Sequence, residues 1–297
     1  DNRRQIDLWA AKWAREKYYN RLQEMNVEVH AVVGNHTAYF KDTNSINTLD
    51  NLLGEYENVH TYSEATEVTI GGLPILFIPW INNENSETTY KLIEGTSCDY
   101  AMGHLELNGF EAHRGYLMEH GAESKRYKKF TKVLSGHYHH RSSRGNIHYL
   151  GNPYQIYWND YRDTRGFHIF DTETGDLKFI KNPFEIYEKI YYDETKLNSS
   201  TFDYAQYNNT IVKIVVEKKT DSHKFDFFLS QLYAAGVHEV KVIEDPSFES
   251  DLEEEIDIDS EDTLTLLERY VDDLGHEDKP GVKTILKSLY VEALELV

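Results

Sequence analysis

Short apolar runs alternate with amphipathic segments along the first 180 residues, which predicts strands mixed with helices. Residues 3–25 carry apolar side chains mostly at helical spacing, and we interpret Trp9 and Trp13 on this helix as core residues. Further helices are expected at 46–53 and 86–94. The segments expected to be strands are 27–33, 67–70, 73–79, 99–103, 132–136, 147–150, 165–171 and 177–180. The pairs around Gly71-Gly72 and around residues 172–175 indicate hairpins. These elements predict a layered α/β sandwich flanked by helices.

The pattern changes near Pro183, where a β-β-α-β group begins. Its elements are expected at 187–192, 210–217, 222–235 and 237–243. We therefore expect four parts: a first domain at 1–183, a small α+β domain at 184–245, a linker at 246–260 and a helical segment at 261–297. Pro280 and Gly281 are interpreted as the break between two terminal amphipathic helices.

The net charge of −20 is unevenly distributed. Residues 244–278 hold 16 acidic residues and one basic residue, so this segment carries −15 and the rest of the chain only −5. The folded body is thus not acidic enough to exclude nucleic acid as a partner. A single cysteine, Cys98, suits a reducing compartment, and no apolar run approaches the ~18 residues that span a membrane. We expect a cytoplasmic protein without membrane contact.

Candidate chemistry follows three of the predicted strands. Gly34-Asn35-His36, Gly103-His104 and Gly136-His137-Tyr138-His139-His140 each come directly after an apolar run. Strand ends in α/β proteins collect functional groups, and imidazole suits transition metals. In an extended segment His137 and His139 face the same way, while His140 points elsewhere.

Taken singly, each cluster has an ordinary structural explanation, such as a turn asparagine, a core histidine or a surface histidine. Together, and in this order, they favour a metal site assembled from distant loops. We expect Gly34 to permit a sharp turn at the end of its strand.

The order G-N-H, G-H, G-H-x-H resembles the calcineurin-like metallophosphoesterases, and within them the SbcD branch of DNA-repair nucleases. Asp1-Asn2-Arg3-Arg4 resembles the end of that branch's second motif. The stretches 104–110 and 149–153, with Trp80, resemble its T-even bacteriophage members.

The resemblance implies a nuclease that uses two divalent ions, usually Mn2+, to hydrolyse phosphodiester bonds. On the matched positions, Asn35, His104 and His137 would hold one ion and His139 would help to hold the other. His36 would act on the scissile phosphate, either by stabilising developing charge or by protonating the leaving oxygen. Two such ions lower the pKa of a bridging water and hold both oxygens in line.

Two departures from the family pattern bear on activity. Thr37 replaces the aspartate that usually follows G-N-H, and we expect an altered orientation of His36 without loss of metal binding. The first motif and the bridging carboxylate are not found in the sequence, and we expect them to lie upstream of Asp1. Residues 1–297 alone are therefore expected to bind metal poorly and to show little nuclease activity.

The resemblance also implies partners. Arg141, Arg144, Arg162 and Arg165 follow the histidine motif and are candidates for contacts with DNA phosphates, although an ordinary loop role is equally compatible. Residues 184–245 would cap the active site, and 261–297 would dock onto an SbcC-type coiled-coil ATPase. A homodimer is implied through early helices, with Trp9, Trp13 and the 46–53 helix as candidates.

Three functions remain open from the sequence. The first is the nuclease subunit of an SbcCD-type DNA end-processing complex in recombination, repair and replication. It would act as an exonuclease on double strands and as an endonuclease on single strands. The second is a metallophosphatase that acts on another phosphoester. The third is a non-catalytic adaptor of the ATPase, which Thr37 slightly favours.

Overall fold

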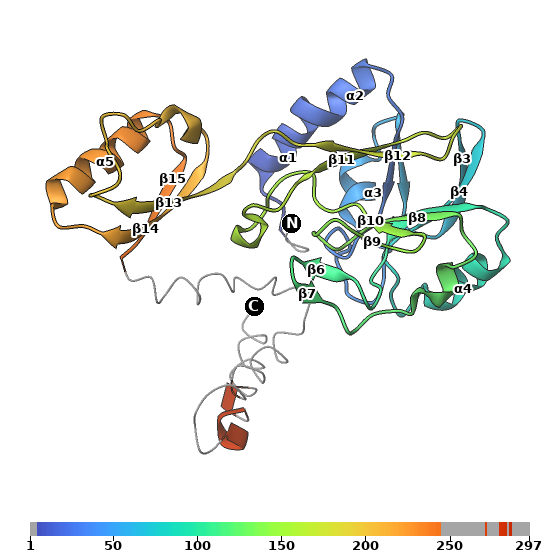
Figure 1. Cartoon of the computed structure of the whole chain (residues 1–297). Helices are drawn as coiled ribbons and strands as arrows, with labels where there is room; N and C mark the ends of the chain where they lie inside the picture. Colours follow the sequence, from blue (N-terminus) through green and yellow to red (C-terminus); the bar gives the residue numbers. More distant parts are fainter. Residues whose placement is uncertain (1–4, 245–270, 272–278, 284, 287–297) are drawn as a thin grey trace. The chain divides into compact units, whose positions relative to one another are not determined.

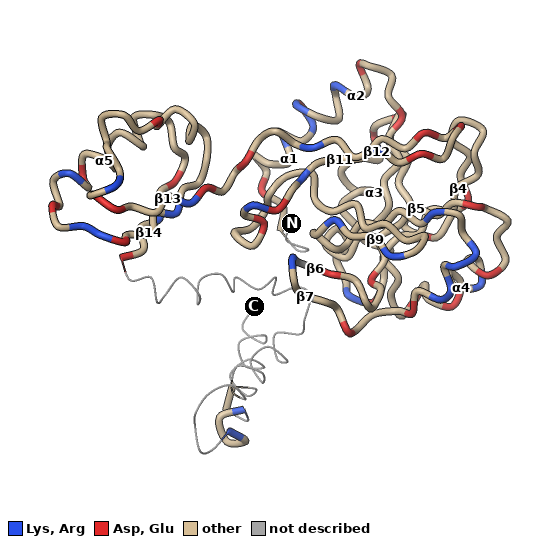
Figure 2. Tube along the Cα trace, viewed as in Figure 1, with Lys and Arg blue, Asp and Glu red and all other residues tan. Residues whose placement is uncertain are grey.

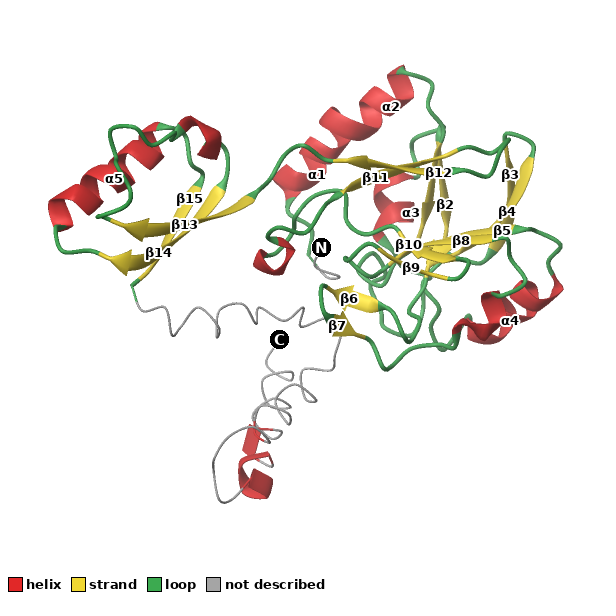
Figure 3. Cartoon of the chain, in the orientation of Figure 1, coloured by secondary structure: helices red, strands yellow, loops and turns green. Residues whose placement is uncertain are grey.

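The computed structural model describes residues 5–244, 271, 279–283 and 285–286 (Figure 1). The chain divides into two compact units. The first comprises Asp1–Ile156 and Asp160–Glu188, and the second comprises Tyr157–Asn159 and Lys189–Val297. Both contain strands together with helices, several sheets and few helices in all among the described residues, which agrees with the expected α/β class (Figure 3). The particular layered sandwich of the metallophosphoesterases stays a prediction.

A continuous helix opens the first unit. It consists of α1 (Leu8–Ala14), a π-helical stretch (Arg15–Tyr19) and α2 (Asn20–Glu24), and the Asp7 carboxylate caps it by accepting from the Ala10 N–H at 2.8 Å. The prediction that Trp9 and Trp13 are core residues is wrong. They are 66% and 46% exposed and contact each other, with ring centroids 5.0 Å apart. Helical spacing identified an apolar stripe, but both tryptophan rings keep a large exposed area.

A mixed six-stranded sheet forms the centre of the first unit, in the order β3-β4-β5-β8-β10-β9. Strands β4, β5, β8 and β10 are parallel to their neighbours in that run, whereas β3 and β9 are antiparallel at the two edges. The bounds are β3 (Thr66–Ile70), β4 (Leu73–Ile78), β5 (Tyr100–His104), β8 (Lys132–Gly136), β10 (Ile147–Tyr149) and β9 (Ser142–Arg144). The main apolar core packs on this sheet and includes Leu76, Ile78, Ala101 and Val133.

Smaller elements surround that sheet. Strands β1 (Val29–Val32) and β2 (Val59–Tyr62) form a parallel pair connected through α3 (Thr48–Leu53), and β6 (Glu111–His113) pairs with β7 (Tyr116–Leu117). The hairpin expected after residue 165 is present as β11 (Gly166–Phe170) and β12 (Leu177–Lys181). Helix α4 (Ser86–Gly95) confirms the helix predicted at 86–94.

A lysine holds the end of α4. The ammonium of Lys129 lies 3.0, 3.1 and 2.6 Å from the carbonyl oxygens of Ile93, Glu94 and Thr96. A cation at this position satisfies carbonyls that lack intrahelical partners. Basic and acidic residues are interspersed along the chain of the first unit (Figure 2).

The second unit has the predicted β-β-α-β order, with β13 (Tyr187–Asp193), β14 (Ile211–Lys218), α5 (Ser222–Ala234) and β15 (Glu239–Ile243). The sheet order is β13-β14-β15, and β14 and β15 are parallel. The expected linker at 246–260 lies outside the described residues, as does most of 261–297. Residues 279–283 are helical and include Pro280 and Gly281, whereas residues 272–278, which would test the predicted break between two helices, lie outside the described residues. Among the described residues no helix is long and apolar enough to cross a bilayer.

Candidate metal centre

The sheet register brings the predicted donors together at the carboxyl ends of parallel strands. Residue His104 ends β5 and pairs with Gly136, which ends β8, so His137 follows beside it. The Val33 carbonyl accepts from the Trp80 N–H at 2.7 Å, which ties the segment after β1 to the end of β4. Asn35 Oδ1 lies 2.8 Å from His104 Nε2, and His137 Nδ1 lies 3.3 Å from that same nitrogen. Three candidate metal ligands, Asn35, His104 and His137, therefore lie together although the first and the last are about a hundred positions apart in the sequence.

The glycines of these motifs make room for the His104 ring. A Cβ at Gly34 would lie 2.9 Å from His104 Cε1, and a Cβ at Gly136 would lie 3.4 Å from His104 Nδ1. A Cβ at Gly103 would instead meet the Ile78 carbonyl oxygen at 2.5 Å. The turn expected after this strand is present, because the Thr37 and Ala38 N–H groups both donate to the Gly34 carbonyl at 3.1 Å. Gly34 does not have a positive φ, so the turn does not require the conformational freedom of glycine. Glycine is needed at position 34 because a side chain there would collide with the His104 ring.

Thr37 fastens the turn that presents Asn35 and His36. Its hydroxyl accepts from the Gly34 N–H at 2.8 Å and donates to the Gly34 carbonyl at 3.0 Å. Such local side-chain bonds replace the ladder bonds that a strand end has lost. Thr37 thus has a defined structural role here, while its effect on the orientation of His36 stays a prediction.

The segment after His104 is held by residues to which the sequence analysis gave no role. Ser135 Oγ accepts from the Leu105 N–H at 3.0 Å, and the Tyr149 hydroxyl donates to the Leu105 carbonyl at 2.9 Å. The Tyr138 hydroxyl donates to the Leu107 carbonyl at 2.9 Å. Burial raises the pKa of both tyrosines, so both remain neutral donors. The sequence signal for this support was the position of Tyr138 inside the histidine motif and of Tyr149 directly after His148.

The histidine motif leaves the strand abruptly. His137 has a φ of 87°, in the left-handed region that non-glycine residues rarely adopt. The segment from His137 to His139 is therefore not extended, and the alternation that we expected to align these two rings does not apply. His137 Nε2 lies 4.0 Å from the carboxylate of Glu106, and burial raises the pKa of that carboxyl group.

The electrostatics favour neutral imidazole at the centre of the cluster. Burial first, and then the neighbouring His137, His36 and His139, hold the pKa of His104 well below its usual 6.5. A neutral ring is the form that binds a metal ion. The same causes indicate that His36, His137 and His139 all lie close enough to His104 to lower its pKa.

The spacing of the donors suits a bound cation. Ligand atoms at adjacent corners of an octahedron of radius about 2.1 Å lie about 3 Å apart. The distances from His104 Nε2 to Asn35 Oδ1 and His137 Nδ1, 2.8 and 3.3 Å, fall around that value. In the part of the chain that the structure describes, no three His, Cys, Asp or Glu side chains are grouped to hold a metal. The cluster relies on the Asn35 amide and contains no carboxylate, so its donors fit one ion but do not neutralise its charge.

His36 borders a cavity of about 640 Å³ in the first unit. The wall is formed by the opening helix and α3, through Ala11, Leu49 and Leu52, and Tyr154 contributes as well. His36 is thus near the cluster electrostatically and also faces a space that can admit another molecule.

The four candidate arginines do not share one environment. Arg141, Arg144 and Arg162 are exposed, and the Arg141 guanidinium lies 4.2 Å from the centroid of the Phe179 ring. Arg165 is only 6% exposed and is bonded to two carboxylates and a backbone carbonyl. Its guanidinium has no surface to offer a phosphate, so the interpretation of Arg165 as a DNA contact does not agree with its burial.

Together, the fold and the cluster define an α/β protein that has a polar, histidine-rich site at the ends of its parallel strands. Comparison with known proteins shows what this protein is related to. The chain is 33% identical to exonuclease subunit 1 of Enterobacteria phage T4 over 301 aligned positions, which cover 99% of this chain and 85% of the relative. The chain belongs to the family of that phage exonuclease subunit, and the resemblance to bacteriophage members is confirmed. No family model matches the chain.

Proposed function

We propose that this chain is the nuclease subunit of an SbcCD-type DNA end-processing complex. It hydrolyses phosphodiester bonds in DNA, as an exonuclease on double strands and as an endonuclease on single strands, with two Mn2+ ions as cofactors. The observation that carries the proposal is the meeting of Asn35, His104 and His137 within hydrogen-bonding distance. The name of the T4 relative, an exonuclease subunit, supports the same chemistry.

Each residue has a distinct part in this proposal. Asn35, His104 and His137 hold one ion, and His139 contributes to holding the second. When bound, the ions supply Lewis acidity toward the phosphate and a hydroxide nucleophile. His36 borders the adjacent cavity, where it stabilises the developing charge or protonates the leaving oxygen. The exposed Arg141, Arg144 and Arg162 contact DNA phosphates.

Two protein partners belong to the proposal. A second copy of the chain packs against the exposed stripe that contains Trp9 and Trp13, because tryptophans with 66% and 46% exposure are unfavourable in water. The ATPase subunit binds through residues 261–297. Deleting residues 260–297 should abolish co-purification of the ATPase and leave the first unit folded, and unchanged co-purification would contradict this assignment.

The test is cleavage by the full-length protein with its ATPase partner. We expect Mn2+-dependent release of nucleotides from linear duplex DNA. His36→Ala should lose cleavage and keep Mn2+ binding, whereas Asn35→Ala should weaken Mn2+ binding. Hydrolysis of a generic phosphoester without DNA cleavage would favour a phosphatase. ATPase binding with no hydrolysis under any metal would favour an adaptor.

A further inference from the structure

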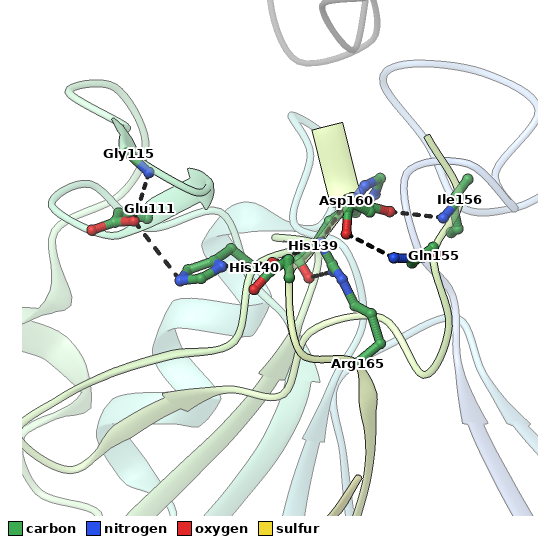
Figure 4. Close-up of polar contacts among 9 residues, drawn as sticks. Glu111, Gly115, His139, His140, Gln155, Ile156, Asp160 and Arg165 are labelled. Atoms are coloured by element: carbon green, nitrogen blue, oxygen red, sulfur yellow. Dashed lines mark hydrogen bonds and ion pairs between the residues drawn. The ribbon is translucent and has the colours of Figure 1, made fainter. Parts of the chain in front are cut away.

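Arg165 lies at the centre of a buried polar network (Figure 4). Its Nη2 lies 2.6 Å from Asp160 Oδ1 and 2.9 Å from Asp163 Oδ2, and its Nη1 donates to the backbone carbonyl of His139. The arginine side chain is 5% exposed, and the two carboxylates are 1% and 11% exposed. The fork of the guanidinium thus binds two acids and the His139 peptide at once, which a lysine ammonium cannot reproduce.

The partners of Arg165 are fixed in turn. Asp160 Oδ2 accepts from the Ile156 N–H at 2.7 Å, and Gln155 Nε2 donates to the Asp160 carbonyl at 3.1 Å. Asp163 Oδ2 lies 2.9 Å from His140 Nδ1. Asp160 is thus held by the segment 155–156, which lies outside the histidine loop, while Asp163 also joins Arg165 to His140 of that loop.

The peptide that follows His139 is held at both of its polar atoms. Its carbonyl accepts from Arg165 and also from the Asn152 N–H at 3.1 Å, while its N–H, that of His140, donates to the Ala112 carbonyl at 3.1 Å. Strand β8 has ended at Gly136, and His137 has a left-handed φ. Strand geometry therefore does not fix the direction of His139, and the surrounding bonds must fix it.

We propose that Arg165 is a positioning residue for His139. Through the His139 carbonyl, and anchored by Asp160 and Asp163, it sets the place of the His139 imidazole relative to His104 and His137. This inference rests on the proposed function, in which His139 helps to hold the second metal ion. It gives Arg165 a role in metal affinity instead of a role in DNA binding.

The test is Arg165→Lys in the full-length protein, with Arg126→Lys as the matched control. Arg126 is an exposed arginine that pairs with Glu94 and stacks on Tyr90, away from the site. Mn2+ binding is followed by the loss of the free-ion EPR signal, and folding by thermal unfolding without metal. We expect Arg165→Lys to weaken binding of one of two ions by about 10- to 100-fold, because outer contacts of ligands have effects of this size. Added Mn2+ should restore kcat, and the KM for DNA should stay unchanged.

Asp163→Asn provides a second variant if Arg165→Lys does not fold. It leaves the pair between Arg165 and Asp160 intact, so we expect a smaller loss of Mn2+ affinity in a folded protein. Wild-type Mn2+ affinity in a folded Arg165→Lys or Asp163→Asn protein would overturn the inference. A raised KM for DNA with unchanged Mn2+ affinity would also overturn it and would return Arg165 to phosphate binding. Failure of the wild-type protein itself to bind Mn2+ would overturn the proposed function as well.

Discussion

Replacing Gly34 by alanine tests how the cluster is built. The added methyl carbon would lie 2.9 Å from His104 Cε1 and 3.1 Å from both ring nitrogens. Ordinary contacts between such atoms are about 3.5–4.0 Å long, so the ring must retreat by roughly 0.6 Å or more. Retreat from residue 34 carries Nε2 away from the neighbouring Asn35. The 2.8 Å contact between Nε2 and Asn35 Oδ1 then lengthens beyond the range of a hydrogen bond.

The magnitude follows from the cost of overpacking a well-packed site, about 1–3 kcal/mol. If that cost falls on the metal-binding geometry, it corresponds to a roughly 5- to 150-fold loss of Mn2+ affinity, since about 1.4 kcal/mol is tenfold. The fold should survive, because the three nearest neighbours of this methyl group are ring atoms and not backbone.

The assay is Mn2+ titration by EPR, together with urea unfolding, for a graded series of Gly→Ala variants of the full-length protein. Gly136→Ala meets the same ring at an ordinary 3.4 Å and should lose less affinity, while Gly95→Ala meets nothing within 4 Å and is the neutral control. Gly103→Ala meets the Ile78 backbone at 2.5 Å and should destabilise the fold. Equal Mn2+ affinities for the Gly34 and Gly95 variants would refute the reasoning.

Three further predictions concern stability. Thr37→Val should lower the free energy of unfolding by about 1–3 kcal/mol, because it leaves the buried Gly34 N–H without its hydroxyl acceptor. Urea unfolding is the measurement, and Thr37→Ser, which keeps the hydroxyl, is the control. Lys129→Met should lower the thermal stability of the first unit, because three carbonyls at the end of α4 lose their cation, and an unchanged Tm would contradict that role. Glu194, bonded to the Thr220 hydroxyl and to the Thr220 and Asp221 N–H groups, has its pKa lowered from 4.5 to about 2. It should therefore stabilise the second unit fully above pH 4.5 and lose this effect as the pH falls toward 2; Glu194→Gln should flatten this part of the pH–stability profile.

Much of the local structure could be predicted from periodicity. Helix α4, the hairpins β3–β4 and β11–β12, and the β-β-α-β order of the second unit follow from spacing and turn residues, which are local properties. The motif histidines were also found correctly at strand ends. Each of these conclusions depends on residues within a few positions of one another.

The burial of individual side chains and the direction of the backbone after a strand could not be predicted from such local patterns. Trp9 and Trp13 belong to an apolar stripe at helical spacing, yet both are exposed. Spacing along one helix does not determine whether another segment packs over it. Arg165 lies beside exposed arginines in the sequence, but two aspartates and a backbone carbonyl enclose it. His137 leaves the extended conformation at a residue type that gives no sign of a positive φ.

The sequence by itself determined which chemical groups stand at the ends of which strands, because strand limits and turns are set by neighbouring residues. Only the tertiary structure decided which atoms meet. The register of β5 against β8 placed His104 beside His137, and missing side chains at Gly34 and Gly136 left the space for the ring. Contacts of this kind depend on packing between segments tens of residues apart, and such packing is a property of the whole fold.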